Sequence, residues 1–192
     1  MKELSDMTLE ELWQLFPIIL KDYNPEYKEW YEIEKERLLQ NFNDVILRIN
    51  HIGSTSVEGL ISKPTVDILM EIRNDSNIDR VKEKLASMGW LLMNSTDKPK
   101  FRQTYNKGYT KYGFAEKVYH LHVRYLDDWN ELYFRDYLRE HKDVADEYAK
   151  LKLSLWKKYE HDRDGYTDAK SKFVLRMTEE ARKKYKNRYS IN

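Results

Sequence analysis

Two apolar stretches of strand length, separated by a corner rich in glycine and hydroxyl groups, constrain the fold of this chain more than any other feature. Residues 45–49 form the first stretch and residues 65–72 form the second. Short runs rich in valine, isoleucine and leucine predict strands, and two of them in succession predict a sheet. The corner between them contains one glycine and then three hydroxyl side chains: Gly53, Ser54, Thr55 and Ser56.

This corner has the composition of an anion-binding site. Glycine lets backbone N–H groups approach an anion closely, and a helical turn after it would direct its positive end at the same place. Asp67 is a carboxylate inside an apolar stretch, which is costly unless it is paired or bound to a metal. A phosphate cradle beside a carboxylate that holds a divalent cation is the arrangement of phosphoryl or nucleotidyl transfer. An ordinary tight turn is the alternative interpretation.

Four blocks of sequence together resemble the GrpB family. Residues 53–68 resemble the pattern G-S-x-S/T-V-x-G-L-x-x-K-P-x-x-D-I of that family. Three further blocks follow in the same order as in the family, at residues 119–123, 134–139 and 166–173. The resemblance runs from about residue 18 to residue 182, which is nearly the whole chain.

The resemblance implies a fold and a domain organisation. The family belongs to the nucleotidyltransferase-like superfamily, so we expect an α+β fold: a nucleotidyltransferase-like mixed sheet with helices on one face and a helical C-terminal half. Residues 1–17 lie outside the match, and Thr8 with Glu11 forms a capping-box pattern there. We therefore expect residues 1–17 to be an N-terminal helical extension and residues 18–192 to be the GrpB-like domain.

One position departs from what the superfamily implies for an active enzyme. Its active members usually place two acidic residues two positions apart on the strand that carries Asp67, but the second position is Leu69 here. Glu71 shares a strand face with Asp67 but lies roughly 13 Å along, four residues at about 3.3 Å each. Catalysis by two metals is therefore in doubt, whereas binding of one Mg²⁺ or Mn²⁺, or binding without a metal, stays open.

Two histidines are the remaining candidates for chemistry. His120 and His122 alternate with apolar residues, so both side chains lie on one face of a predicted strand. If the protein is an enzyme, Asp67, His120 and His122 are the predicted catalytic residues, and Asp67 and His122 are the predicted metal ligands. Two hydrogen-bonded surface histidines are the alternative interpretation.

Basic side chains could complete the phosphate site. Lys63 precedes a proline beside the corner, and Arg102 lies on a neighbouring predicted strand, so either could reach a phosphate. A solvated loop lysine is an equally good interpretation of Lys63. Lys152 and Lys170 occur in helical segments from which they could face the cleft, although a surface charge or a partner in an ion pair is the favoured interpretation of each.

The rest of the chain predicts further elements around this centre. We expect helices over residues 26–40 and 79–88 and helix throughout from residue 128. Residues 18–20 and 90–93 predict short strands, the second of them buried. Residues 100–106 and 117–126 predict a hairpin whose strands are joined by a polar loop at residues 107–113.

Composition narrows the classes of function. Lys and Arg number 34 against 33 Asp and Glu, so no global field attracts nucleic acid, and the absence of cysteine excludes disulfides and thiolate chemistry. The N-terminal apolar run at residues 15–20 is interrupted by Pro17 and is too short to span a bilayer. We expect a cytoplasmic protein whose partner is a phosphate-containing small molecule, with neither a membrane nor a nucleic acid as partner.

Two functional hypotheses of different classes follow. In the first, the protein is a nucleotidyltransferase-type transferase that binds a nucleotide or another phosphate-containing ligand. In the second, it is a catalytically inactive module that binds a ligand or a protein partner in the same cleft. The resemblance makes a coenzyme A-related ligand conceivable, because relatives can be fused to dephospho-coenzyme A kinase. Leu69 favours the inactive module, and the two histidines favour chemistry.

Overall fold

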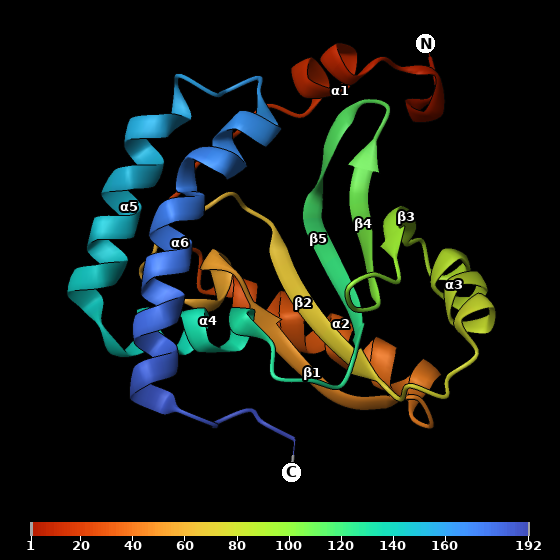
Figure 1. Ribbon diagram of the computed structural model, residues 1–192. Helices are drawn as coiled ribbons and strands as arrows, with labels where there is room; N and C mark the ends of the chain where they lie inside the picture. The colour runs from red at the N-terminus through yellow and green to blue at the C-terminus, as the bar shows by residue number, and fades with distance from the viewer. Residues whose placement is uncertain (1, 192) are drawn as a thin grey trace.

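A mixed sheet forms the centre of the molecule. The structure is a computed structural model and describes residues 2–191. Within these residues, five strands pair in the order β1-β2-β5-β4-β3 (Figure 1). The strands are β1 (Ile46–Ile52), β2 (Val66–Ile72), β3 (Leu91–Thr96), β4 (Arg102–Thr110) and β5 (Gly113–Tyr125). The central pair, β2 and β5, is parallel, and the other pairs are antiparallel.

Two helices cover one face of this sheet and bury the main core. They are α2 (Glu26–Phe42) and α3 (Ile78–Ser87). Alternate residues of β2 and β5, such as Ile68 and Leu121, pack against aromatic side chains of α2, such as Tyr27 and Trp30. Because strand side chains alternate between faces, this packing sends the side chains between them, including Asp67, to the opposite face.

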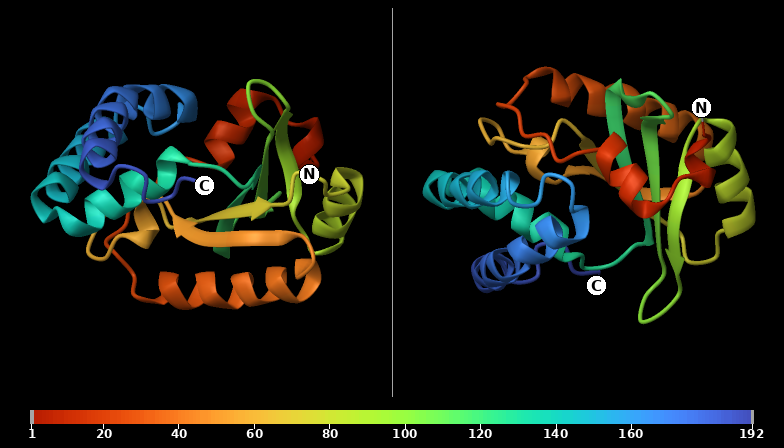
Figure 2. Two further views of the ribbon diagram at one scale, coloured as in Figure 1. Left: turned by 60° about the horizontal axis from the view of Figure 1, so that its bottom comes forward. Right: turned by 90° about the horizontal axis from the view of Figure 1, so that it is seen from above.

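The C-terminal half is helical, as predicted, and lies beside the β1–β2 side of the sheet (Figures 1 and 2). Its helices are α4 (Asn130–Glu140), α5 (Lys142–Trp156) and α6 (Arg163–Tyr185). Leu69 of β2 is fully buried in a small cluster with Trp129 and with Leu132 of α4. The position two residues after Asp67 is therefore an apolar contact for the helical half and not a second carboxylate.

The hairpin of β4 and β5 differs from the prediction. Residues 107–113 were expected to form a long polar loop, but β4 continues to Thr110, and β5 begins at Gly113. Tyr109 pairs with Phe114 across the two strands, and both rings pack against Phe16. Glycine and lysine made this segment look like a loop, whereas aromatic contacts with a distant part of the chain stabilise it as strand.

Two predicted short strands also differ. Residues 90–93 were expected to form a buried strand, but β3 is the edge strand of the sheet, and Leu91 and Met93 are 52% and 54% exposed. Residues 18–20 form no strand, and the nearest pairing is an isolated bridge between Lys21 and Ser62. Leu91 and Met93 are exposed because an edge strand has a neighbour on one side only. Ile18 is buried, but its backbone bonds to Glu160 and Trp156 instead of to a strand.

The N-terminal segment packs on the sheet hairpin. It contains a short 3₁₀ turn, η1 (Leu4–Asp6), and the helix α1 (Leu9–Leu15), whose capping box joins Thr8 and Glu11 as predicted. Phe16 follows the helix and is buried against Tyr109 and Phe114. The division of the chain at residue 17 stays a prediction. Among residues 2–191, no helix is both long and apolar enough to cross a membrane.

Candidate functional site

The corner after β1 is shaped by one glycine. Gly53 has a positive φ of 70° and leads into a 3₁₀ turn, η2 (Ser54–Ser56). A β-carbon on Gly53 would lie 2.4 Å from Oδ2 of Asp67, which is closer than real β-carbons approach any atom. The glycine is therefore needed for two reasons, its backbone conformation and the position of the Asp67 carboxylate on β2.

Of the three hydroxyl groups in the corner, only that of Ser54 is directed at a cavity rather than at the backbone. Thr55 donates its hydroxyl hydrogen to the carbonyl oxygen of Thr65 at 3.1 Å, and Ser56 donates to that of Gly53 at 2.6 Å. Because the hydroxyl hydrogen of Thr55 is donated to Thr65, Oγ1 of Thr55 accepts the Nε2–H of the buried His51 at 3.0 Å. Thr55 and Ser56 therefore hold the corner together, although both were predicted to bind phosphate.

A hydrogen-bonded chain fixes Asp67 and His120. Nδ1 of His120 lies 3.1 Å from Oδ1 of Asp67, and its Nε2 lies 2.7 Å from the hydroxyl of Tyr109. Arg163 donates to the same hydroxyl at 2.7 Å. An ionised carboxylate can only accept, so Nδ1 of His120 carries the hydrogen, and Nε2 accepts from Tyr109. His120 is thus held as one neutral tautomer with both ring nitrogens occupied.

The second histidine is less constrained. Nε2 of His122 lies 3.5 Å from Oδ1 of Asp67. The strand that carries both histidines, β5, pairs in parallel with β2, and Asp67 is opposite His120 in the register. The strand face that carries both imidazoles thus lies beside Asp67. Of the two histidines, His120 has the more buried side chain.

The titration behaviour of this group keeps a negative charge on the aspartate. Burial raises the pKa of Asp67, but hydrogen bonding from His120 and the nearness of His122 outweigh burial and leave that pKa below its ordinary value. Burial lowers the pKa of His120, and the neighbouring Arg163 and Lys63 add to this against the opposing effect of Asp67. At neutral pH the pair is therefore a carboxylate and a neutral imidazole.

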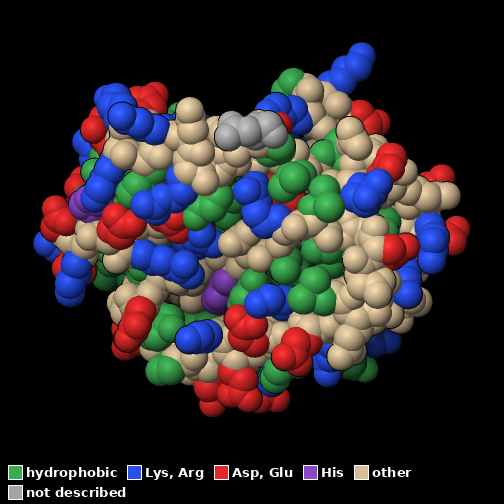
Figure 3. All heavy atoms as spheres, turned by 90° about the horizontal axis from the view of Figure 1, so that it is seen from below, with side chains coloured by type: hydrophobic (Ala, Val, Ile, Leu, Met, Phe, Trp, Pro, Cys, Tyr) green, Lys and Arg blue, Asp and Glu red, His purple; other side chains and the backbone are tan. Residues whose placement is uncertain are grey.

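Three lysines face the same cavity as Asp67. This space, which we call the cationic cavity, has a volume of about 180 Å³. Its lining consists of Gly53, Ser54, Thr55, Lys63, Thr65, Asp67, His120, Tyr148, Lys152, Tyr166 and Lys170. The space-filling view from below shows several Lys and Arg side chains gathered beside a histidine (Figure 3).

The lysines are held by aromatic rings and backbone rather than by carboxylates. Lys152 is only 2% exposed, and its Nζ donates to Oγ of Ser54 at 3.1 Å and to the carbonyl oxygen of Ile61. It lies 4.7 Å from the ring centre of Tyr148, and Lys170 lies 4.1 Å from that of Tyr166. Among residues 2–191, the ion pairs of Asp67 are with the two histidines, and no carboxylate pairs with Lys63, Lys152 or Lys170.

Burial, together with neighbouring positive charges, lowers the pKa of each of these lysines. Burial lowers the pKa of Lys152 to about 7, and the charges of Lys170 and Lys63 contribute. Burial, with Arg163 and Lys170 adding to it, likewise lowers the pKa of Lys63 to about 7. For Lys170 burial lowers the pKa to about 8, with Asp67 opposing the change. A positive group that is enclosed without a counter-ion prefers to be neutral, and a bound anion would reverse this preference.

An unused hydroxyl group points to the same conclusion. Tyr166 is completely buried at the cavity wall, and within the described residues its hydroxyl has no hydrogen-bond partner. Buried hydroxyl groups in native proteins are nearly always bonded to protein or water. Tyr166 therefore has a free donor beside Lys63 and Lys170, where an oxygen of a ligand or a water molecule could accept it.

Two residues considered from the sequence lie away from this cavity. Arg102 is exposed, and its guanidinium lies 5.2 Å from the ring centre of Trp129 instead of lining the cavity. Glu71 is fully buried near the other end of β2 and accepts from Nη2 of Arg48 at 2.7 Å. The charge of Glu71 is thus paired with that of Arg48, and Glu71 cannot supply the second carboxylate of a metal site.

The donor set around Asp67 suits an anion better than a bare metal ion. Within residues 2–191, no three histidine, aspartate or glutamate side chains converge so as to hold a metal. Asp67 is a single carboxylate, already bonded to His120 and faced by three lysines. Mg²⁺ is commonly held by one or two carboxylates together with phosphate oxygens. The residues present do not form a metal cage of their own, so any Mg²⁺ or Mn²⁺ would require ligands from a bound phosphate.

Surface charges or ion pairs were the favoured interpretation of Lys152 and Lys170, but the fold places both in the cavity. A signal for this exists in the chain. Tyr148 precedes Lys152 by four residues, and Tyr166 precedes Lys170 by four, so each ammonium lies over a ring on the same helix face. Each tyrosine belongs to the apolar stripe of its helix, which marks the lysine beside it as facing inward.

Comparisons with known proteins agree with this architecture. The family model described as GrpB protein matches residues 17–180. UPF0157 protein YqkA of Bacillus subtilis is 31% identical over 88% of this chain. Glutamate-rich protein GrpB of Alkalihalophilus pseudofirmus is also 31% identical, over 82% of this chain and 91% of that protein. The chain spans 49% of YqkA and 63% of UPF0157 protein PA4798 of Pseudomonas aeruginosa, so it covers about half to two thirds of these two relatives.

A solved structure is similar over almost its full length. The crystal structure of conserved protein GrpB from Enterococcus faecalis is 29% identical and covers 87% of this chain and 99% of its own, with a TM-score of 0.76. The predicted fold class is confirmed: the chain is α+β, with a mixed sheet, helices on one face and a helical C-terminal half.

Proposed function

The chain belongs to the GrpB family, and we propose that it binds a phosphate-containing small molecule in the cationic cavity. The observation that carries the proposal is a set of three lysines that line one small cavity: Lys63, Lys152 and Lys170. Within the described residues, none of them forms an ion pair with a carboxylate, since Asp67 pairs with the histidines. Enclosed charge is costly unless it is paired. A ligand that supplies two or more negative charges would provide the missing partners.

The geometry favours phosphate over other anions. Ammonium groups, the hydroxyl of Ser54 and the unpaired hydroxyl of Tyr166 all offer hydrogens to the cavity, as the oxygens of a phosphate require. A volume of about 180 Å³ accommodates a short phosphate chain rather than a large molecule. Asp67 lies at the edge of this group, where it could share a divalent cation with phosphate oxygens.

Group transfer is a second candidate function, and one observation favours it. Nε2 of His122 lies near Asp67 and, unlike the ring of His120, is not fixed by two hydrogen bonds. It could therefore act as a general base toward an acceptor hydroxyl. Against this stands Leu69, whose burial under α4 leaves Asp67 as the carboxylate of β2 that lines the cavity. Binding is thus the primary proposal, and transfer depends on a cation brought in with the phosphates.

Calorimetric titration with sodium tripolyphosphate tests the proposal, with and without Mg²⁺ or Mn²⁺. We expect binding by the wild-type chain, and a loss of at least about tenfold in Lys152→Met, since one charged hydrogen bond is worth roughly 1.5–3 kcal/mol. Lys150→Met is the matched control, because Lys150 is an exposed lysine of the same helix. Equal binding by both variants, or none by the wild type under any of these conditions, would contradict the proposal.

A further inference from the structure

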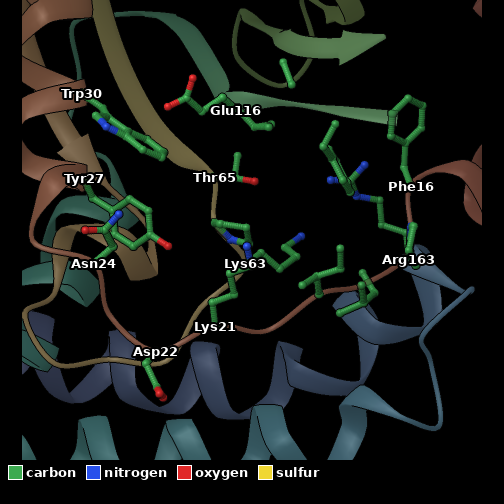
Figure 4. Close-up of a pocket in the computed structure, with 17 residues that line it drawn as sticks. Phe16, Lys21, Asp22, Asn24, Tyr27, Trp30, Lys63, Thr65, Glu116 and Arg163 are labelled. Carbon is green, nitrogen blue, oxygen red and sulfur yellow. The ribbon is translucent and has the colours of Figure 1, made fainter. Parts of the chain in front are cut away.

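A second cavity shares a wall with the cationic cavity. It has a volume of about 410 Å³, and Lys63 and Thr65 line both spaces. Figure 4 shows Tyr27 and Trp30 on one side of it, Phe16 and Arg163 on the other, and Lys63 and Thr65 between them. We call this space the aromatic cavity.

The walls of the aromatic cavity come from parts of the chain that are far apart in sequence. Phe16 follows α1, Tyr27 and Trp30 belong to α2, and Phe114 belongs to β5. The rings of Tyr27 and Trp30 meet edge to face at 5.4 Å, and those of Phe16 and Phe114 are 5.1 Å apart. Aromatic side chains arranged in this way suit a planar ring, which can pack on them face to face or edge to face.

Polar groups at the rim restrict the chemistry of such a ring. Asp22 and Glu116 are exposed carboxylates that line the cavity, and Asn24 lines it beside Asp22. Carboxylates are acceptors, so they suit a ring that carries N–H donors at its edge. Two cations line the cavity, Lys63 at the wall shared with the cationic cavity and Arg163 beside Phe16, and they suit a negative group attached to that ring.

We propose that the aromatic cavity holds a planar, amino-bearing heteroaromatic ring of the same ligand whose phosphate groups occupy the cationic cavity. This inference rests on the proposed phosphate binding and adds the class of the ligand: an organic phosphate such as a nucleotide, with the ring and the phosphate on either side of Lys63 and Thr65. A volume of about 410 Å³ lies within the range of small-molecule sites.

Titrations of the full chain with ATP and with sodium tripolyphosphate separate the two parts of the ligand, because the two compounds share a triphosphate and differ by a nucleoside. We expect ATP to bind at least about tenfold more tightly, as one stacked base commonly provides. UTP, whose base lacks an exocyclic amino group, should bind more weakly than ATP.

Ala115→Trp provides the structural test, because Ala115 is an exposed residue at this cavity and a tryptophan there would fill it. We expect the variant to lose the advantage of ATP while its affinity for tripolyphosphate stays within about twofold. Leu175→Trp, at an exposed site on α6 outside both cavities, is the control and should behave as wild type. Circular dichroism checks that both variants fold.

Fluorescence gives a second readout that does not depend on Ala115. ATP bound beside Trp30 should quench part of the tryptophan emission, and Trp30→Phe should remove that part while retaining a ring in the wall. Equal affinities for ATP and tripolyphosphate, or an ATP advantage that survives Ala115→Trp, would overturn this inference alone. Absence of binding by both compounds would overturn the proposed phosphate site as well.

Discussion

Gly53 and Asp67 are in direct contact: a β-carbon at position 53 would lie 2.4 Å from Oδ2 of Asp67. Two features of the corner depend on this contact. The chain can take its positive φ into η2, and the carboxylate can stay between the corner and His120. The glycine of the corner therefore serves the acidic residue of the next strand as well as the turn itself.

The first prediction concerns this contact. Gly53→Ala should lower the free energy of unfolding by about 1–3 kcal/mol, because a positive φ and a displaced carboxylate both carry a cost. Urea denaturation measures the loss. Gly59→Ala is the matched control, since Gly59 also has a positive φ but open space at its β-carbon. If the two variants lose the same stability, the contact with Asp67 contributes nothing beyond backbone strain.

The second prediction concerns the tautomer of His120. Tyr109→Phe removes the hydroxyl that donates a hydrogen bond to Nε2 of His120, so the population of the Nδ1–H tautomer should fall. Nitrogen-15 NMR of the imidazole reports the tautomer directly. Phosphate affinity should weaken by roughly threefold to tenfold, as expected for one lost hydrogen bond in a positioning network. Tyr112→Phe, at an exposed ring in the same hairpin, should change neither quantity.

The third prediction separates binding from stability. Lys170 lies over the ring of Tyr166 without a carboxylate partner in the described residues, so Lys170→Met removes a charge that the fold does not pair. We expect the melting temperature without ligand to rise by about 2–4 °C, equivalent to roughly 1 kcal/mol, while binding of tripolyphosphate weakens. Lys172→Met, at an exposed position on the same helix, is the control. A variant that is less stable and binds normally would show that Lys170 is structural.

The fourth prediction concerns the pH dependence of binding. An anion favours the protonated lysines, and Lys63 and Lys152 have pKa values of about 7 without ligand. Affinity for tripolyphosphate should therefore be highest near pH 7 and fall by up to about tenfold per pH unit above 8 for each lysine that must take up a proton. Titrations at pH 8 in buffers of different ionisation enthalpy should reveal net proton uptake. Affinity that is constant from pH 7 to 9 would contradict this.

The stability of the ligand-free chain should change in the opposite direction. Between about pH 7 and 10.5 the unfolded chain keeps protons on lysines that are neutral in the folded chain. The unfolded state thus binds more protons over this window, and the contribution of these lysines to the free energy of unfolding rises with pH. Urea denaturation at pH 7 and pH 9, compared between the wild type and Lys152→Met, isolates that contribution.

Local sequence patterns determined the centre of this protein. Alternation along β5 places His120 and His122 on one face of that strand, because neighbouring residues on a strand point in opposite directions whatever surrounds them. The apolar spacing of α2 and the glycine of the corner are local signals of the same kind, and the structure has both. These features could be read from the chain because each depends only on residues a few positions apart.

Only the tertiary structure decided which side chains surround that centre. The spacing of each lysine from a tyrosine of its helix marks Lys152 and Lys170 as facing inward, but only the packing of α5 and α6 brings both of them to one cavity with Asp67. Packing of Phe16 on the hairpin likewise converts a predicted loop into strand and encloses the aromatic cavity. The hydroxyl groups of Thr55 and Ser56 turned inward because nearby backbone carbonyls were available. Each outcome depends on contacts between segments distant in sequence or on backbone geometry, and spacing along the chain specifies neither.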